Sequence, residues 1–217
     1  MDRRSESIEE YLEAMFKLSL SPGGITVGRL AAELSVAPSS VSEMLARLDS
    51  AGLVARSEGH VELTPDGRHE GASLVRRPRL SERFLVDVLE VPWDQVHDEA
   101  CKFEHALSSD VEARLAERLG NPATCPHGYA IPDEHGELAE AAARPLADLQ
   151  TGERGIISCV DEADPELLRY LASLGLLPET RVSIESVAPF GGPQLVRVGR
   201  AQYALGREVA ARVFVRV

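Results

Sequence analysis

The sequence is poor in cysteine and in long apolar segments, and each shortage excludes a class of protein. Its three cysteines, Cys101, Cys125 and Cys159, are odd in number and far apart, which argues against a disulfide framework and favours a reducing compartment. No apolar run reaches the roughly 18 residues that a membrane span needs. The N-terminus also lacks the apolar core of a signal peptide. We therefore expect a cytoplasmic protein that does not enter a membrane.

Basic residues are also scarce. Lysine and arginine total 23 against 35 aspartates and glutamates, and the net charge of −12 opposes non-specific attraction to nucleic acid. A prediction of DNA binding must therefore rest on local pattern. The length of 217 residues, with 44% hydrophobic and 27% charged residues, is typical of a globular protein with two or three domains. Internal repeats, GxSxG, HExxH and Gly-rich phosphate loops are absent.

The first part of the chain has the pattern of a winged helix. Apolar residues at helical spacing predict an amphipathic helix over residues 6–20, and a second, short helix follows over 27–34. After a tight turn, Pro38 stands in the first turn of a third helix, as in a helix-turn-helix pair. Two alternating segments, 53–57 and 60–64, then predict a β-hairpin that would form the wing.

Hydroxyl and guanidinium groups gather around the predicted third helix. The candidates for DNA contact are Arg29, Ala37, Ser39, Ser40, Ser42, Arg47 and Arg56. Hydroxyls at a helix N-terminus can contact phosphates or base edges, and arginines can contact phosphates. Glu43 on the same helix would repel phosphate unless it accepts a hydrogen bond from a cytosine amino group. Winged helices also bind proteins, so an adaptor function remains an alternative.

Residues 96–105, VHDEACKFEH, carry metal-binding groups at helical spacing. In a helix, His97, Cys101, Glu104 and His105 fall at i, i+4, i+7 and i+8 and share one face. These groups are costly to bury unless they are paired or coordinated. A thiolate with imidazole and carboxylate suits a divalent transition metal. The alternative is a metal- or thiol-dependent enzyme with Cys101 as nucleophile and His105 as base, although no third orienting group accompanies them.

The remaining segments complete a fold that is mainly α with a small β part. A long helix from residue 65 to about 89 contains Pro78, which would kink or split it. The helices up to residue 119 have broad apolar faces that suit a dimer interface or a monomer core. Cys125 and His127 are able to bind metal, but the surrounding Pro and Gly indicate a loop. Five short strands and one helix after residue 145 predict a small β-barrel.

Three segments together resemble the diphtheria toxin repressor family of metal-dependent transcriptional regulators. They are VAPSSVS at 36–42, the segment 96–105, and CPHGYAIP at 125–132, followed by an SH3-like end similar to FeoA-like domains. The resemblance implies a winged-helix domain over 1–72, a helical metal-binding and dimerisation domain over 73–140, and an SH3-like domain over 148–217. It also implies a homodimeric repressor, without enzyme activity, that binds double-stranded operator DNA when it holds Mn²⁺ or Fe²⁺.

The same resemblance implies two metal sites. The primary site would consist of Glu10, Cys101, Glu104 and His105, and the ancillary site of Glu82, His97, Asp164 and Glu166. Glu13 matches a second carboxylate of the manganese-responsive members. Glu10 together with Cys101 mixes the manganese-type and iron-type ligand sets, so the sequence does not choose between the metals. Pro78 stands where the family has a further histidine ligand, so the ancillary site is incomplete in this chain.

Overall fold

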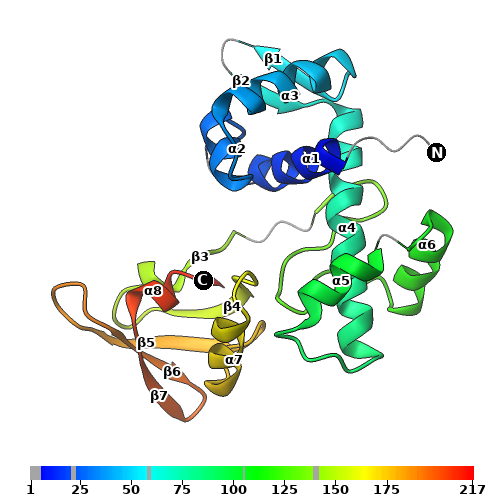
Figure 1. Ribbon diagram of the computed structural model, residues 1–217. Coiled ribbons are helices and arrows are strands. Elements are labelled where there is room, and N and C mark those ends of the chain that lie inside the picture. Colours follow the sequence, from blue (N-terminus) through cyan, green and yellow to red (C-terminus); the bar gives the residue numbers. More distant parts are fainter. Residues whose placement is uncertain (1–5, 21–22, 58–59, 105, 139–141) are drawn as a thin grey trace. The chain divides into compact units, whose positions relative to one another are not determined.

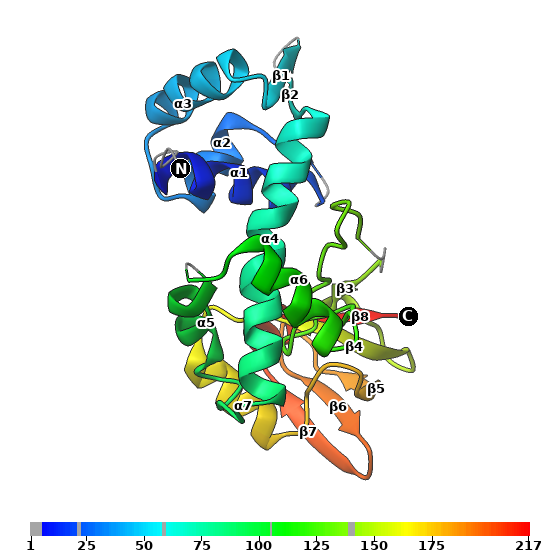
Figure 2. The same cartoon turned by 90° about the vertical axis from the view of Figure 1, so that its right-hand side faces the viewer.

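The computed structural model describes residues 6–20, 23–57, 60–104, 106–138 and 142–217 (Figures 1 and 2). The chain divides into two compact units. One comprises Met1–Arg77 and Pro132–Leu138, and the other comprises Pro78–Ile131 and Ala139–Val217. The boundary falls inside the long helix α4 (Pro65–Asp87), at its internal proline. No helix in the described part of the chain is long and apolar enough to cross a membrane.

The first unit is the predicted winged helix. Its elements before α4 are α1 (Glu6–Ser19), α2 (Val27–Glu33), α3 (Pro38–Ser50), β1 (Val54–Ser57) and β2 (His60–Leu63) (Figure 1). The Thr26 side chain caps α2 by accepting from the Arg29 amide, and Pro38 begins α3. Apolar side chains of these elements, among them Leu30 and Leu45, are fully buried in one core. The strands pair antiparallel, with Val54 opposite Leu63, which confirms the wing.

Two glycines allow the start of α4 to pack tightly on this unit. A Cβ at Gly67 would lie 1.9 Å from the carbonyl oxygen of Leu53, and one at Gly71 would lie 2.9 Å from Cβ of Phe16. Any side chain at either position would therefore force the helix away. Phe16 then packs fully buried against α4. These contacts explain why α4 keeps two residues that are poor helix formers.

The helices of the second unit form two small cores. The later part of α4, α5 (Val96–Glu104) and α6 (Ser109–Arg118) carry them. Leu80 packs with Cys125 and Ile131, and Leu85 packs with Val96 and other residues of α5. Pro78 does not split α4, which is continuous to Asp87. A proline removes only one backbone donor from the helix, and the helix on both sides of Pro78 is held by packing.

The C-terminal part of the second unit is a six-stranded antiparallel sheet with α7 (Pro165–Ser173). The strands are β3 (Arg144–Pro145), β4 (Arg154–Val160), β5 (Arg181–Val187), β6 (Gln194–Val198), β7 (Ala201–Leu205) and β8 (Val213–Arg216), with the short helices η1 (Leu146–Asp148) and α8 (Arg207–Ala210). Their order is β3-β8-β4-β5-β6-β7. This confirms the small β domain. The pairs between described residues leave that order open, so a closed barrel stays a prediction. A register shift between Ile157 and Cys159 bends β4.

Candidate metal centre and DNA-binding surface

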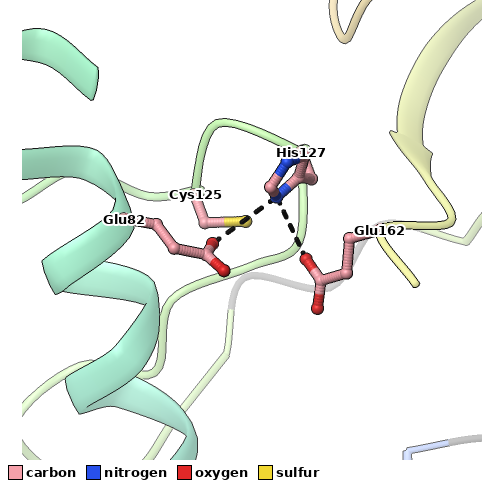
Figure 3. Close-up of side chains that lie close together, drawn as sticks. All are labelled: Glu82, Cys125, His127 and Glu162. Carbon is pink, nitrogen blue, oxygen red and sulfur yellow. Dashed lines mark ion pairs between the residues drawn. The ribbon is translucent and has the colours of Figure 1, made fainter. Parts of the chain in front are cut away.

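Four side chains of the second unit converge on one point (Figure 3). They are Glu82 of α4, Cys125 and His127 of the loop after α6, and Glu162 of the loop between β4 and α7, and their ligand atoms all lie within 4.8 Å of one another. Cys125 and His127 are fully buried, and Glu82 is 1% exposed. The Glu162 side chain is 21% exposed. We call these four residues the buried cluster.

Backbone hydrogen bonds set the shape of the Cys125–His127 loop. The Cys125 amide donates to the carbonyl of Tyr129 at 2.8 Å, and the Gly128 amide donates to the carbonyl of Cys125 at 2.9 Å. The Arg83 guanidinium of α4 donates to the Cys125 carbonyl at 3.0 Å. Gly128 has φ +92°, and a Cβ there would lie 2.0 Å from the carbonyl oxygen of Ser158. The loop is therefore fixed between α4 and β4 with its thiol and imidazole turned inward.

A backbone carbonyl sets the orientation of His127. Its Nε2 lies 2.8 Å from the carbonyl oxygen of Trp93, and because a carbonyl only accepts, Nε2 carries the proton. The other ring nitrogen, Nδ1, faces two carboxylates, at 3.6 Å from Glu82 Oε2 and 3.1 Å from Glu162 Oε2 (Figure 3). A carbonyl that fixes one ring nitrogen and leaves the other for a cation is a common arrangement around histidine metal ligands.

Three buried atoms of the cluster have no hydrogen-bond partner among the described residues. They are Glu82 Oε2, His127 Nδ1 and Glu162 Oε2. The distances from His127 Nδ1 to the two carboxylates permit ion pairs, but neither contact has the geometry of a hydrogen bond. Leaving buried polar atoms unsatisfied costs free energy, and most native structures avoid it. With the Cys125 thiol they make a set of one sulfur, one nitrogen and two oxygens, which fits a divalent transition metal.

The protonation of the cluster follows from its burial and close charges. Burial lowers the pKa of His127, but the Cys125 thiol and the two carboxylates outweigh burial and raise that pKa to about 12. Burial raises the pKa of Glu82, but the ion pair with His127 and the hydrogen bond with His97 outweigh it and lower that pKa to about 2. Burial also raises the pKa of the Cys125 thiol. At neutral pH and without a cation, His127 and Cys125 therefore hold protons that a bound metal would displace.

The second oxygen of Glu82 extends this arrangement to α5. Glu82 Oε1 lies 3.0 Å from Nδ1 of His97, and His97 Nε2 lies 4.0 Å from Sγ of Cys101. The Cys101 thiol and the Glu82 carboxylate raise the pKa of His97 to about 10. The structure thus places the predicted residues Glu82, His97 and Cys101 in one chain of contacts.

The other predicted metal ligands lie as follows. Cys101 and Glu104 are half-buried on α5, and Glu10 is exposed on α1 of the first unit. Glu13 pairs with Lys17 at 2.8 Å. His105 lies outside the described residues. The primary site of Glu10, Cys101, Glu104 and His105 therefore stays a prediction, as does the enzyme alternative that needs His105.

The C-terminal domain contributes Glu162 to the buried cluster, and not the predicted ligands Asp164 and Glu166. Asp164 caps α7, and its Oδ1 accepts from the amides of Glu166 at 2.9 Å and Leu167 at 3.2 Å. Glu166 is exposed. The carboxylate in the buried cluster belongs to Glu162, which the sequence interpretation did not name. The sequence indicates that Cys125 and His127 are able to bind metal and lie in a loop, and their Cys-x-His spacing is the signal for the site.

The predicted DNA-contacting residues surround an uncapped helix N-terminus. Ala37 is the N-cap residue of α3 and makes no side-chain cap hydrogen bond. Exposed residues on or beside α3 are Ala37, Ser39, Ser40, Ser42 and Arg47, and Arg56 is exposed on β1. The Arg29 guanidinium donates to the Gly24 carbonyl at 2.5 Å. Backbone N–H groups of an uncapped first turn suit a phosphate.

Comparison with known proteins agrees with a DNA-binding domain followed by a metal-binding domain. The profile "Iron dependent repressor, N-terminal DNA binding domain" matches residues 4–60, "Iron dependent repressor, metal binding and dimerisation domain" matches 64–133, and "FeoA domain" matches 144–217. The iron-dependent repressor IdeR of Mycobacterium tuberculosis H37Rv is 35% identical in an alignment that covers 98% of each chain. The chain belongs to the iron-dependent repressor family.

Other members of the family are also similar to this chain in sequence and in structure. The diphtheria toxin repressor of Corynebacterium diphtheriae is 36% identical over 145 residues, which cover 64% of this chain and 63% of that protein. A solved manganese-dependent transcriptional repressor in complex with manganese is 35% identical, with a TM-score of 0.85 over 96% of this chain and 99% of that one. The structure of ScaR with bound Cd²⁺ is 28% identical, with a TM-score of 0.79 over 96% and 98%.

Proposed function

We propose that this protein is a metal-dependent transcriptional repressor that binds operator DNA as a homodimer when it holds Mn²⁺ or Fe²⁺. The observation that carries the proposal is the buried cluster. Its carboxylate and imidazole atoms without hydrogen-bond partners among the described residues lie close together beside a thiol. Family membership supplies the DNA-binding and dimerisation functions of the matched regions. Relatives named as repressors support a regulator and not an enzyme. A repressor acts where its operator is, so we place it in the cytoplasm.

Two groups of residues would hold metal. The buried cluster would hold one ion through Glu82, Cys125, His127 and Glu162, with His97 against the second oxygen of Glu82. The primary site would use Glu10 with Cys101, Glu104 and His105, as the family resemblance implies. A bound cation supplies positive charge that offsets the carboxylates and favours the deprotonated thiol. The donor set suits Fe²⁺ through its thiol and Mn²⁺ through its carboxylates.

Bound metal would promote DNA binding by increasing the population of the protein arrangement that can bind DNA. Glu10 lies on the first helix of the winged helix, and two of its proposed partners, Cys101 and Glu104, lie on α5. Ligands shared between the two would favour the arrangement in which α3 can bind DNA. Ser39, Ser40 and Ser42 would contact phosphates or base edges, and Arg29, Arg47 and Arg56 would contact phosphates.

A selection experiment followed by a gel shift tests the proposal. Duplexes are selected from a random pool with the full chain in Mn²⁺ or Fe²⁺, and the selected duplex is titrated with and without each metal over a range of salt. We expect retarded bands only with metal and weaker binding at higher salt. Enrichment of no duplex, or binding that is unchanged when metal is removed, would refute metal-dependent repression.

A further inference from the structure

The outer face of the C-terminal sheet carries four arginines on four adjacent strands. They are Arg216 on β8, Arg154 on β4, Arg181 on β5 and Arg197 on β6. Ile156 of β4 lies opposite both Arg216 and Arg181, and Ser183 of β5 lies opposite both Arg154 and Arg197. Because side chains alternate along a strand, these four arginines share the face that points away from the core.

The arginines line a groove of about 680 Å³. Ser183 adds a hydroxyl to its wall, and Ile156 and Val217 add apolar surface. Pockets that hold small ligands usually have volumes of about 300–1,000 Å³ and combine apolar surface with a few polar groups. We call this feature the arginine groove.

The charges in the groove are only partly matched within the protein. Arg197 Nε donates to Glu185 at 2.7 Å, and Arg216 Nη1 donates to Glu179 at 2.8 Å. Arg154 and Arg181 are exposed and form no ion pair or hydrogen bond with any residue that the structure describes, although the charge of Arg154 adds to the hydrogen bond from Arg197 in lowering the pKa of Glu185. Four guanidiniums thus face two carboxylates in a chain whose net charge is −12. The two spare cations lie diagonally across β4 and β5, where like charges repel.

The position of the groove restricts what it can bind. Strands β8, β4, β5 and β6 each have a neighbour on both sides, so a peptide cannot add to them through backbone hydrogen bonds. Recognition must come from the side chains, and the guanidinium fork matches carboxylate and phosphate groups. The volume of the groove, about 680 Å³, is that of a site for a small molecule.

We propose that the arginine groove binds a small polyanion that carries at least two carboxylate or phosphate groups. Arg154 and Arg181 contact it directly, and Arg197 and Arg216, held by their glutamates, provide the remaining positive charge. The proposal does not depend on the metal centre or on DNA binding, since none of the groove residues belongs to either.

Calorimetry with the metal-free full chain tests the proposal, because some of the probes chelate metals. The probes are inorganic pyrophosphate, fructose 1,6-bisphosphate, citrate and succinate at constant ionic strength. We expect at least one of them to bind one per chain with a Kd below about 1 mM. The double variant Arg154→Gln/Arg181→Gln should weaken that binding at least about tenfold.

A matched variant and two larger anions complete the experiment. Arg118→Gln/Arg207→Gln removes the same charge at exposed positions outside the groove and should bind the probe as the parent does. Absence of binding by all four probes, or equal weakening in both double variants, would overturn the proposal. So would binding of only a random duplex DNA or a hexaglutamate peptide through Arg154 and Arg181.

Discussion

At the scale of single residues, the orientation of His127 decides what the buried cluster can bind. The Nε2–H of His127 donates a hydrogen bond to the Trp93 carbonyl, so Nδ1 remains for the cation beside Cys125 and the two carboxylates. The raised pKa values of His127 and Cys125 mean that both are protonated at pH 7 when no metal is present. Metal binding must release these protons, so affinity should fall as the pH falls.

The variant Cys125→Ser should weaken this site and change its proton release. The experiment uses a Cys101→Ala background. This change removes the thiol of the predicted primary site and leaves Cys125 as the thiol of the buried cluster. Calorimetry with Mn²⁺ at pH 7 in two buffers of different ionisation enthalpy should show release of about two protons by the background chain and about one by the Cys125→Ser chain. Affinity should fall at least about tenfold.

Cys159→Ser is the matched control for this change. Cys159 is half-buried on β4 and lies outside the cluster, so its replacement should leave affinity and proton release unchanged. Equal effects of the two serine variants, or no effect of Cys125→Ser, would contradict the assignment of Cys125 as a ligand.

At the scale of elements, α7 positions the loop that carries Glu162. Asp164 caps this helix, and Leu171 is fully buried against the sheet. Leu171→Ala should lower the free energy of unfolding of this part by about 2–5 kcal/mol, because it leaves a cavity in the core. Trp93, the single tryptophan, packs against the same core, so its fluorescence during urea unfolding measures the loss.

Tyr170 provides the comparison on the same helix. Tyr170 is 44% exposed, so Tyr170→Ala should change the free energy of unfolding by less than about 0.5 kcal/mol. A loss as large as that of Leu171→Ala would mean that the fluorescence follows general damage to α7 and not the loss of core packing.

The elements differ in how far the sequence predicted them. The winged helix and the small sheet were correctly predicted because hydrophobic periodicity and Pro or Gly at element ends are local signals. Of the two predicted effects of Pro78, a split of α4 is wrong, because packing on both sides of Pro78 keeps the helix in one piece, and a kink stays a prediction. The buried cluster was missed as a unit, since Glu82, the Cys125–His127 pair and Glu162 come from three segments that only tertiary structure brings together.

At the scale of the whole molecule, an acidic chain has to bind DNA through a small local surface. Arg47 is exposed in the last turn of α3 and would contact a phosphate. Arg47→Gln should weaken binding to all duplexes by a similar factor and reduce the slope of log affinity against log salt by about 1. Gel shifts over a salt series, with the selected duplex and a scrambled one, measure both quantities.

Arg118→Gln serves as the control of equal charge. Arg118 is exposed on α6, far along the chain from α3, and should leave the salt slope unchanged. If Arg47→Gln changed the preference for the selected duplex but not the salt slope, Arg47 would contact bases and not phosphate.

The burial of the cluster also affects how fast the protein can respond. Three of its residues are at most 1% exposed, and Glu162 alone is partly open to solvent. We expect an ion to enter or leave through movement of the structure around Glu162, so that exchange follows the rate of that movement and not of diffusion. We expect the occupancy of this site to follow the average metal supply over time and to ignore brief fluctuations.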